Sequence, residues 1–100
     1  MTPLTVTPGT APGGRPLLTV AGEIDLGNAG LLARELEALE TADTAAERVV
    51  VDLTAVDYLD SAGLSVLFVH AERLEIVVSS LLEPVLTYSG LTELAVVRAP

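Results

Sequence analysis

The segment from Asp57 to Gly63 holds the side chains of this sequence that are best suited to chemistry. It reads Asp-Tyr-Leu-Asp-Ser-Ala-Gly, so the hydroxyl of Ser61 directly follows the carboxylate of Asp60. Apolar residues with helical spacing come next: Leu64, Leu67, Phe68 and Ala71, at i, i+3, i+4 and i+7. A serine therefore stands among carboxylates at the expected start of a helix. Further valines in this helix predict that it is mostly buried.

Two interpretations of Ser61 follow from this position. Asp60 or Ser61 could act only as the helix cap, because a side-chain oxygen there accepts hydrogen bonds from the first turn. The same free N–H groups and the positive end of the helix dipole also tolerate a phosphate group. A phosphate would add about 1.5 to 2 negative charges beside Asp57 and Asp60. We predict that Ser61 is a phosphorylation site, with capping as the alternative.

The sequence lacks the additional groups that a catalytic site at these residues would need. A nucleophilic serine needs a base, and His70 lies nine residues from Ser61, roughly 13 Å along a helix. Asp52 follows three valines as the phospho-acceptor of a response-regulator receiver does, but the acidic pair and the lysine of that site are missing. The pair Asp57 and Asp60 lacks a cation or a deep apolar pocket. We therefore expect no catalytic residue and no enzyme.

Composition excludes several further classes of site. The chain has no cysteine and no lysine, which removes disulfides, thiolate metal sites, Schiff bases and the P-loop. Its carboxylates show no spacing typical of metal ligands, so we expect no metal and no cofactor. The net charge of −9 should repel nucleic acid and anionic lipid, which favours a protein partner with a basic face. Solubility is the alternative reason for this charge.

The sequence gives no sign of a membrane segment. No apolar run approaches the ~18 residues of a spanning helix. The start, Met1-Thr2-Pro3-Leu4, lacks the basic residues and long apolar stretch of a signal peptide. We expect a cytoplasmic protein.

Periodicity and turn residues predict five strands and three helices. The strands are expected at 4–7, 17–24, 49–51, 75–79 and 94–98, and turn chemistry fills 8–16, 41–47 and 54–60. A first helix is expected from an Asn28 cap to about residue 41, with Leu32, Leu36 and Leu39 on its apolar face. A third, short helix is expected with Ser80 and Glu83 as a capping box, Pro84 delaying or bending it, and an end near Gly90.

The resulting order β-β-α-β-α-β-α-β predicts an α/β domain spanning residues 1–100, with a mixed, mostly parallel sheet. The run Val49–Val51 does not alternate, which is typical of a central strand covered on both faces. Loops that lead from parallel strands into helices emerge at one edge of a sheet. We therefore expect residues 22–25, 52–61 and 79–80 to share one edge, with Asp25 near Ser61.

Two stretches resemble the STAS-domain anti-sigma factor antagonists of bacteria. They are GEIDLGNAGLLARELEAL and VVVDLTAVDYLDSAGLSVL, and SGLTEL near the end extends the similarity over nearly the whole chain. The resemblance implies a sheet with helices packed chiefly on one face. It also implies a regulator that binds an anti-sigma factor, a serine kinase of the GHKL type, and thereby releases a sigma factor for transcription.

The resemblance also implies the residues of the site. The kinase would phosphorylate Ser61 and a PP2C-type phosphatase would reverse this, while Asp25 matches the partner-binding aspartate of the family. We expect the partner-binding surface to comprise Asp25, Asp57, Asp60, Ser61 and Gly63. The chain departs from the family at Ala62 and Ser65, and its passage from Phe68 to Ile76 is shorter and lacks a Gly-Gly turn. A STAS scaffold or ligand-binding module that works without a kinase is the alternative.

Overall fold

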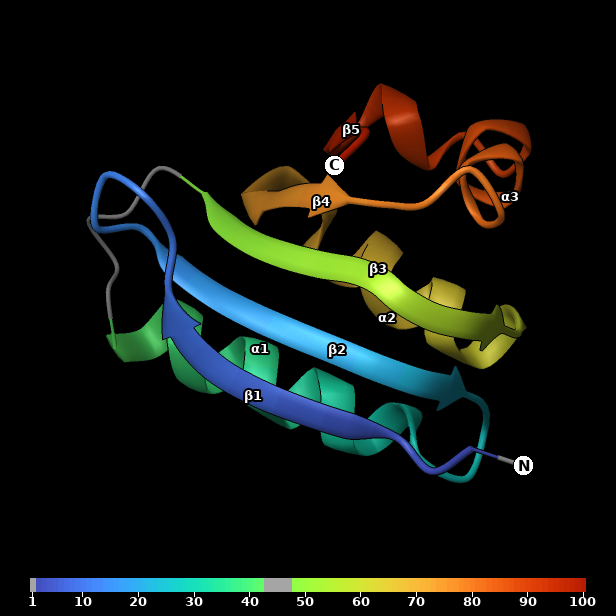
Figure 1. The fold of residues 1–100 in the computed structure, drawn as a ribbon, viewed down its shortest axis with the longest axis horizontal. Helices are drawn as coiled ribbons and strands as arrows, with labels where there is room; N and C mark the ends of the chain where they lie inside the picture. The colour runs from blue at the N-terminus through green and yellow to red at the C-terminus, as the bar shows by residue number, and fades with distance from the viewer. Residues whose placement is uncertain (1, 43–47) are drawn as a thin grey trace.

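The computed structural model describes residues 2–42 and 48–100, which form one sheet with helices against it (Figure 1). The strands are β1 (Thr5–Thr10), β2 (Pro16–Ile24), β3 (Val49–Leu59), β4 (Leu74–Val77) and β5 (Val96–Arg98). The helices are α1 (Ala29–Ala42), α2 (Ser61–His70) and α3 (Glu83–Tyr88), with 3-10 turns at Ala71–Arg73 and Leu91–Glu93. The predicted order of elements is confirmed. The predicted loop at 41–47 falls largely on residues 43–47, outside the described residues.

The sheet is mixed and its strands lie in the order of the sequence, β1-β2-β3-β4-β5. β1 runs antiparallel to β2, and each later pair is parallel. Parallel neighbours need a crossover, and α1, α2 and α3 supply it in turn. In Figure 1, α1 and α2 lie behind the strands of the sheet, and α3 lies beyond the end of β4. Leu32, Leu67 and Leu86 of the three helices join one core cluster, so the predicted packing chiefly on one face is confirmed.

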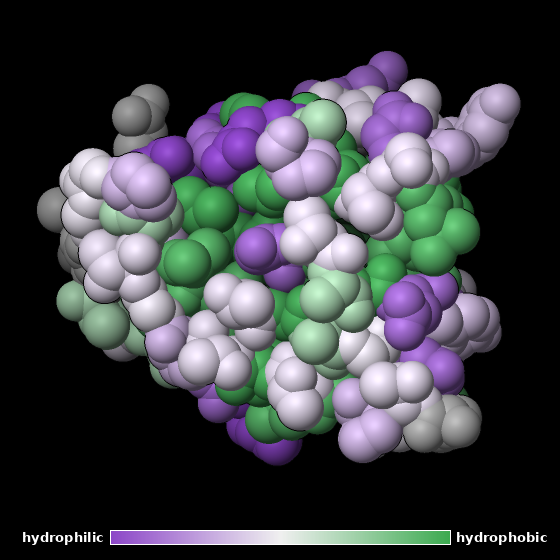
Figure 2. Space-filling model, viewed as in Figure 1, coloured by the Kyte–Doolittle hydropathy of each residue, from purple (hydrophilic) through white to green (hydrophobic). Residues whose placement is uncertain are grey.

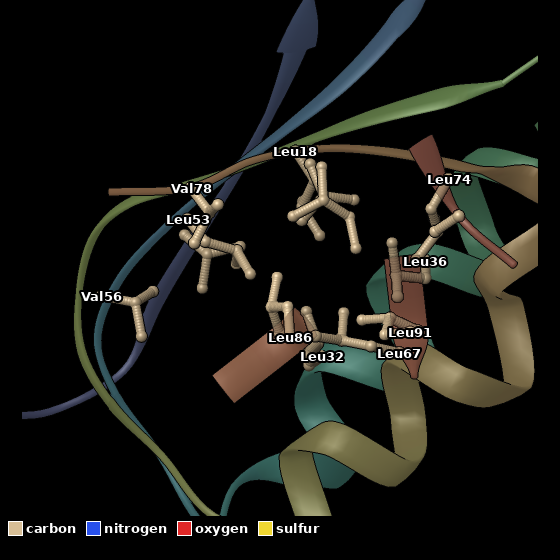
Figure 3. Close-up of a cluster of buried hydrophobic side chains, with 14 of the residues drawn as sticks. Leu18, Leu32, Leu36, Leu53, Val56, Leu67, Leu74, Val78, Leu86 and Leu91 are labelled. Atoms are coloured by element: carbon tan, nitrogen blue, oxygen red, sulfur yellow. The ribbon is translucent and has the colours of Figure 1, made fainter. Parts of the chain in front are cut away.

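The main core lies between the sheet and these helices. Leu32 and Leu36 of α1, Leu67 of α2 and Leu86 of α3 are fully buried against it. Figure 3 shows these leucines meeting strand residues such as Leu18 and Leu53 in one cluster. The described residues include no buried polar or charged side chain. Burial of aliphatic side chains is therefore the main stabilising contribution to the fold.

The face of the sheet turned away from the helices has a smaller cluster. Val50 and Val77 pack there with Ala11, and the partly buried Leu17 covers them. Apolar and polar side chains are mixed over this face in Figure 2. The central strand predicted at Val49–Val51 is thus buried on both sides, although a hairpin turn rather than a helix covers the second side.

The first hairpin is longer than predicted. β1 continues through Pro8, Gly9 and Thr10, which pair with Leu18, Leu17 and Pro16. Pro8 is tolerated because β1 is an edge strand, where a missing N–H need not cost a ladder bond. The turn is therefore confined to the residues from Ala11 to Arg15, whose backbones bond to each other.

β3 overturns the loop predicted at 54–60, since the strand runs on to Leu59. It does so with two irregularities in its pairing to β2, between Thr19 and Ala21 and between Gly22 and Glu23. At the first, Asp52 Oδ1 accepts hydrogen bonds from both the N–H (2.9 Å) and the hydroxyl (2.7 Å) of Thr54. Polar residues that signal a loop here serve a strand with bulges instead.

The expected burial of α2 is only partly right. Gly63 and Leu67 are buried, but Val69 is 80% exposed, because only one face of the helix meets the sheet. The short connection to β4 is made by the 3-10 turn Ala71–Arg73, whose tighter winding needs no Gly-Gly turn.

The third helix and last strand are shorter than expected. α3 is preceded by Leu82 without a side-chain cap, and Glu83 accepts a hydrogen bond from the Thr87 hydroxyl (2.8 Å), so the predicted capping box is wrong. Pro84 lies in the first turn, where proline is tolerated. Gly90 follows the helix with φ of 88°, as predicted for its end. Within the described residues, no helix is long and apolar enough to cross a membrane.

Candidate functional site

Asp60 is the cap of α2. Its Oδ1 accepts hydrogen bonds from the N–H groups of Ala62 (2.9 Å) and Gly63 (3.1 Å). Ser61 is therefore the first residue inside the helix, and it is exposed. Of the two capping candidates, the structure selects the aspartate. The Ser61 hydroxyl is not required for the cap and lies at the surface of the helix N-terminus.

Asp60 also joins α2 to the loop between β2 and α1. Its Oδ2 accepts from the N–H of Leu26 (3.2 Å), and its own N–H donates to the carbonyl of Ile24 (3.2 Å). The flanking strands end level with each other, since Ile24 pairs with Leu59. The structure thus brings the loop of Asp25 beside the start of α2, as the parallel topology predicts.

The loop that carries Asp25 is held by its own side chains. Asp25 Oδ1 accepts from the N–H of Gly27, and Asn28 Oδ1 accepts from the N–H of Asp25, both at 2.9 Å. The amide of Asn28 also donates to the carbonyl of Glu23 (2.9 Å). Asn28 was expected to cap α1, but these two bonds direct its side chain back to the loop. The loop therefore presents its outer side chains on a fixed backbone.

Leu26 is the outermost apolar side chain of this loop, at 82% exposed. Reasoning from the sequence missed it, because the motif drew attention to the carboxylates on either side. The available signal was a leucine within Asp25-Leu26-Gly27-Asn28, a stretch whose other residues favour a turn. Its position next to Asp60 places an apolar group close to the start of α2.

Asp57 lies on the same end of the sheet, at the second irregularity of β3. Gly22 pairs with Val56 and Glu23 with Tyr58, so Asp57 faces no residue of β2 and forms a bulge. Asp57 is exposed, and Tyr58 is 50% exposed. The bulge therefore directs a carboxylate and a ring to the surface near the end of the strand.

Comparisons with known proteins identify the family of this chain. Residues 4–86 match the family of the STAS domain. The chain belongs to the STAS domain family. A comparison with curated proteins finds no match.

Solved structures share the fold of this STAS domain at low sequence identity. An anti-sigma factor antagonist from Mycobacterium paratuberculosis has a TM-score of 0.82 at 22% identity, over 95% of this chain and 85% of its own. An anti-sigma factor antagonist from Thermotoga maritima, described as putative, has a TM-score of 0.70 at 13% identity, over 95% and 86%. The anti-sigma factor antagonist SpoIIAA in its unphosphorylated form has a TM-score of 0.62 at 11% identity, over 84% and 83%.

Gly63 of the STAS domain is buried, unlike the other residues predicted for the surface. A β-carbon built on it would lie 2.5 Å from Cγ2 of Ile24 and 2.6 Å from Cδ1 of Leu59. The absence of a side chain lets the first turn of α2 approach the ends of β2 and β3. Packing therefore accounts for the glycine of the Asp-Ser-Ala-Gly motif.

Other polar residues considered from the sequence lie outside this site. The Asp52 carboxylate accepts hydrogen bonds from the N–H and the hydroxyl of Thr54. The ring of His70 in α2 bonds through Nδ1 to Oε1 of Glu40 in α1, at 2.8 Å. β4 ends at Val77, which pairs with Asp52 of β3, and β3 continues for seven more residues to Leu59. Beyond β4, the carbonyl of Ser79 accepts hydrogen bonds from the N–H groups of Leu82 and Glu83. Ser79 thus belongs to the entry to α3, which lies toward the same end of the sheet as the ends of β2 and β3 (Figure 1).

The two cavities described in the structure lie away from this site. Cavities of about 410 and 230 Å³ are lined by residues elsewhere, around His70 and around Glu75. The described residues contain no group of three or more His, Cys, Asp or Glu suited to a metal ion. Ser61, Leu26 and Asp57 are exposed at the end of the sheet where β2 and β3 end.

Three of the five arginines lie away from this surface. Arg15 and Arg98 both donate to the carboxylate of Glu75, and Arg48 donates to the carbonyl of Leu74. Arg15 first, then Arg98, lowers the pKa of Glu75 from 4.5 to about 2, because each guanidinium stabilises the ionised carboxylate. Glu75 lies at the start of β4, whereas Asp25, Asp57 and Asp60 lie where β2 and β3 end. The candidate site is therefore acidic.

Proposed function

We propose that this STAS domain is an anti-sigma factor antagonist that works by binding and has no catalysis of its own. In this proposal it binds an anti-sigma factor, a GHKL-type serine kinase, and so releases a sigma factor. Phosphorylation of Ser61 by that kinase switches binding off, and a PP2C-type phosphatase restores it. The observation that carries the proposal is the exposed position of Ser61 at the start of α2, beside the loop of Asp25.

Three kinds of support favour this role over others. The family match and three structural neighbours described as anti-sigma factor antagonists supply the analogy. The assignment of the cap to Asp60 leaves Ser61 without a structural duty in the cap. The acidic surface suits a partner with a basic face, since opposite charges speed association and select the correct partner.

The chemistry of a phosphate at Ser61 explains how binding would be switched. The helix N-terminus favours negative charge by about 0.3 to 1 kcal/mol at an exposed position. The N–H groups of Ala62 and Gly63 are already bonded to Asp60, so a phosphate must share them with that carboxylate. A partner that fits a neutral hydroxyl would have to desolvate a dianion. That cost is several kcal/mol, enough to lower affinity by about two orders of magnitude.

The test is phosphorylation followed by binding. We expect purified GHKL-type serine kinases of the source organism, supplied with ATP, to modify Ser61, as mass spectrometry of the peptide would show. The unmodified protein and Ser61→Ala should bind the kinase in a pull-down, and phosphorylated protein should not. Ser61→Asp should imitate the phosphate incompletely, because it carries one charge and a smaller head group.

Ser65→Ala is the matched control. Ser65 is exposed one turn further along α2, and its hydroxyl donates to the carbonyl of Ser61 (2.8 Å). This variant should still be phosphorylated and should bind as the parent protein does. Equal binding of phosphorylated and unmodified protein would reduce Ser61 to a surface residue. If these kinases neither bind nor modify the protein, a kinase-independent scaffold or ligand-binding module is the better interpretation.

A further inference from the structure

We propose that Leu26 is the apolar anchor of the partner-binding surface, and that the partner receives it in an apolar recess rimmed by arginine or lysine. This inference rests on the proposed function. It adds the residue that the partner buries, Leu26, and the chemistry of the partner surface that contacts it. The observation behind it is an 82% exposed leucine on a loop bonded to the residue that precedes Ser61.

A single exposed leucine is ordinary in a folded protein. Leu26 differs because its backbone is fixed at several points. Its N–H donates to Asp60 Oδ2, the next N–H donates to Asp25 Oδ1, and the N–H of Asp25 donates to Asn28. A side chain presented on such a backbone loses less freedom when a partner encloses it, so more of its burial appears as affinity.

The carboxylates around Leu26 are already engaged within the domain. Asp60 accepts three backbone N–H groups, and Asp25 accepts the N–H of Gly27. These carboxylates still attract a positive partner, but an apolar group must exclude water for that attraction to be strong. Leu26 directly follows Asp25 in the loop, and its N–H is bonded to Asp60. Most of its side-chain surface is exposed and can be buried by a partner.

The charge around this anchor sets the chemistry of the receiving face. Asp25, Asp57 and Asp60 lie at this end of the sheet, whereas Arg15, Arg48 and Arg98 lie around Leu74 and Glu75. A complementary face has an apolar centre for Leu26 and cations at its rim. An anionic face would be repelled, and a purely apolar face would desolvate three carboxylates without compensation.

The test is calorimetric titration of purified GHKL-type serine kinases of the source organism with the parent protein, Leu26→Ala, Leu26→Met and Val69→Ala. Val69 is the matched control, because it is an aliphatic side chain 80% exposed, eight residues along α2 from Ser61. We expect Leu26→Ala to weaken binding by roughly 10- to 100-fold, the factor for leaving a leucine unburied. Leu26→Met and Val69→Ala should bind within a few-fold of the parent.

The outcomes separate this inference from the proposed function. Unchanged binding by Leu26→Ala would overturn the anchor while the proposed function stands, and so would an equal loss in Val69→Ala. If no such kinase binds the parent protein, the proposed function fails and the anchor fails with it. Unchanged thermal unfolding of Leu26→Ala, expected for an exposed side chain, would show that a loss of affinity comes from the surface.

Discussion

A β-carbon on Gly63 would lie 2.5 Å from Cγ2 of Ile24, closer than side-chain carbons approach one another in folded proteins. Ile24 is the last residue of β2 and is fully buried, so it cannot move aside without disturbing the core. This close approach seats the first turn of α2 on the ends of two strands. Asp60 then reaches both its own helix and the N–H of Leu26. The geometry of the candidate site depends on a glycine that is not itself exposed.

Replacing Gly63 with alanine should destabilise the domain. The added methyl group meets Ile24 and Leu59, and overpacking of this kind costs about 1 to 3 kcal/mol. Gly30→Ala is the control, because Gly30 lies in α1 with nothing within 4 Å of a new β-carbon. It should change the stability by less than about 0.5 kcal/mol, because Gly30 is exposed in the first turn of α1. Urea unfolding followed by circular dichroism measures both, and equal effects would refute the packing argument.

Loss of the Asp60 carboxylate should cost more than loss of the Ser61 hydroxyl. Asp60→Ala removes the cap of α2 and the acceptor for Leu26, so we expect about 1 to 2 kcal/mol of destabilisation. Ser61→Ala should change the stability by less than about 0.5 kcal/mol, since Ser61 is exposed. Hydrogen exchange of the backbone amides adds a local test. The N–H of Leu26 should exchange faster than in the parent protein in Asp60→Ala, and at the parent rate in Ser61→Ala. A larger cost for Ser61→Ala would contradict the assignment of the cap.

The ion pairs of Glu75 should make the domain sensitive to acid. Arg15 and Arg98 lower its pKa from 4.5 to about 2 in the folded protein, so the unfolded chain binds the proton first as pH falls. The stabilisation is therefore complete above pH 4.5 and is lost between pH 4.5 and about 2. The shift corresponds to at most roughly 3 kcal/mol, and solvent around the two arginines reduces this to about 1 to 2 kcal/mol.

Glu75→Gln tests this directly. The variant should be less stable than the parent at pH 6 and should lose less stability between pH 4.5 and 2, as urea unfolding at each pH would show. Glu37→Gln is the control, because Glu37 is exposed on α1. If both variants follow the same pH profile as the parent, the two arginines do not stabilise the ionised carboxylate.

Much of the fold could be predicted because hydrophobic periodicity fixed the type of each element. The heptad-like leucines of α1 and the unbroken valines of β3 are strong signals, and their order allows few topologies. The predicted boundaries of strands were wrong where local side-chain interactions or strand pairing decide them. Asp52 and Thr54 belong to a bulge rather than a loop, and Pro8 is tolerated because β1 is an edge strand. Pairing partners decide both cases, and a single sequence does not contain them.

The candidate site was predictable in position and less so in detail. Parallel topology alone brings Asp25 and Ser61 to one edge. Which of two adjacent residues caps α2 depends on backbone angles, and the structure assigns the cap to Asp60. The tight packing of Gly63 and the exposure of Leu26 depend on how closely α2 approaches β2, a distance set by the whole core.

Reversing the charge of Asp25 should weaken partner binding and leave the fold intact. Asp25→Lys should lower affinity for the proposed kinase partner by at least tenfold, about 1.4 kcal/mol, because a cation would then face the basic rim that we propose for that partner. Losing the hydrogen bond from Gly27 should cost only about 0.5 to 1.5 kcal/mol of stability. Asp25→Asn retains an acceptor oxygen at this position and separates the two effects.

Glu37→Lys is the control, because it changes the net charge by the same amount at an exposed position on α1. Calorimetry should show near-parent affinity for Glu37→Lys, and equal losses in both lysine variants would mean that net charge, rather than the position of Asp25, governs docking.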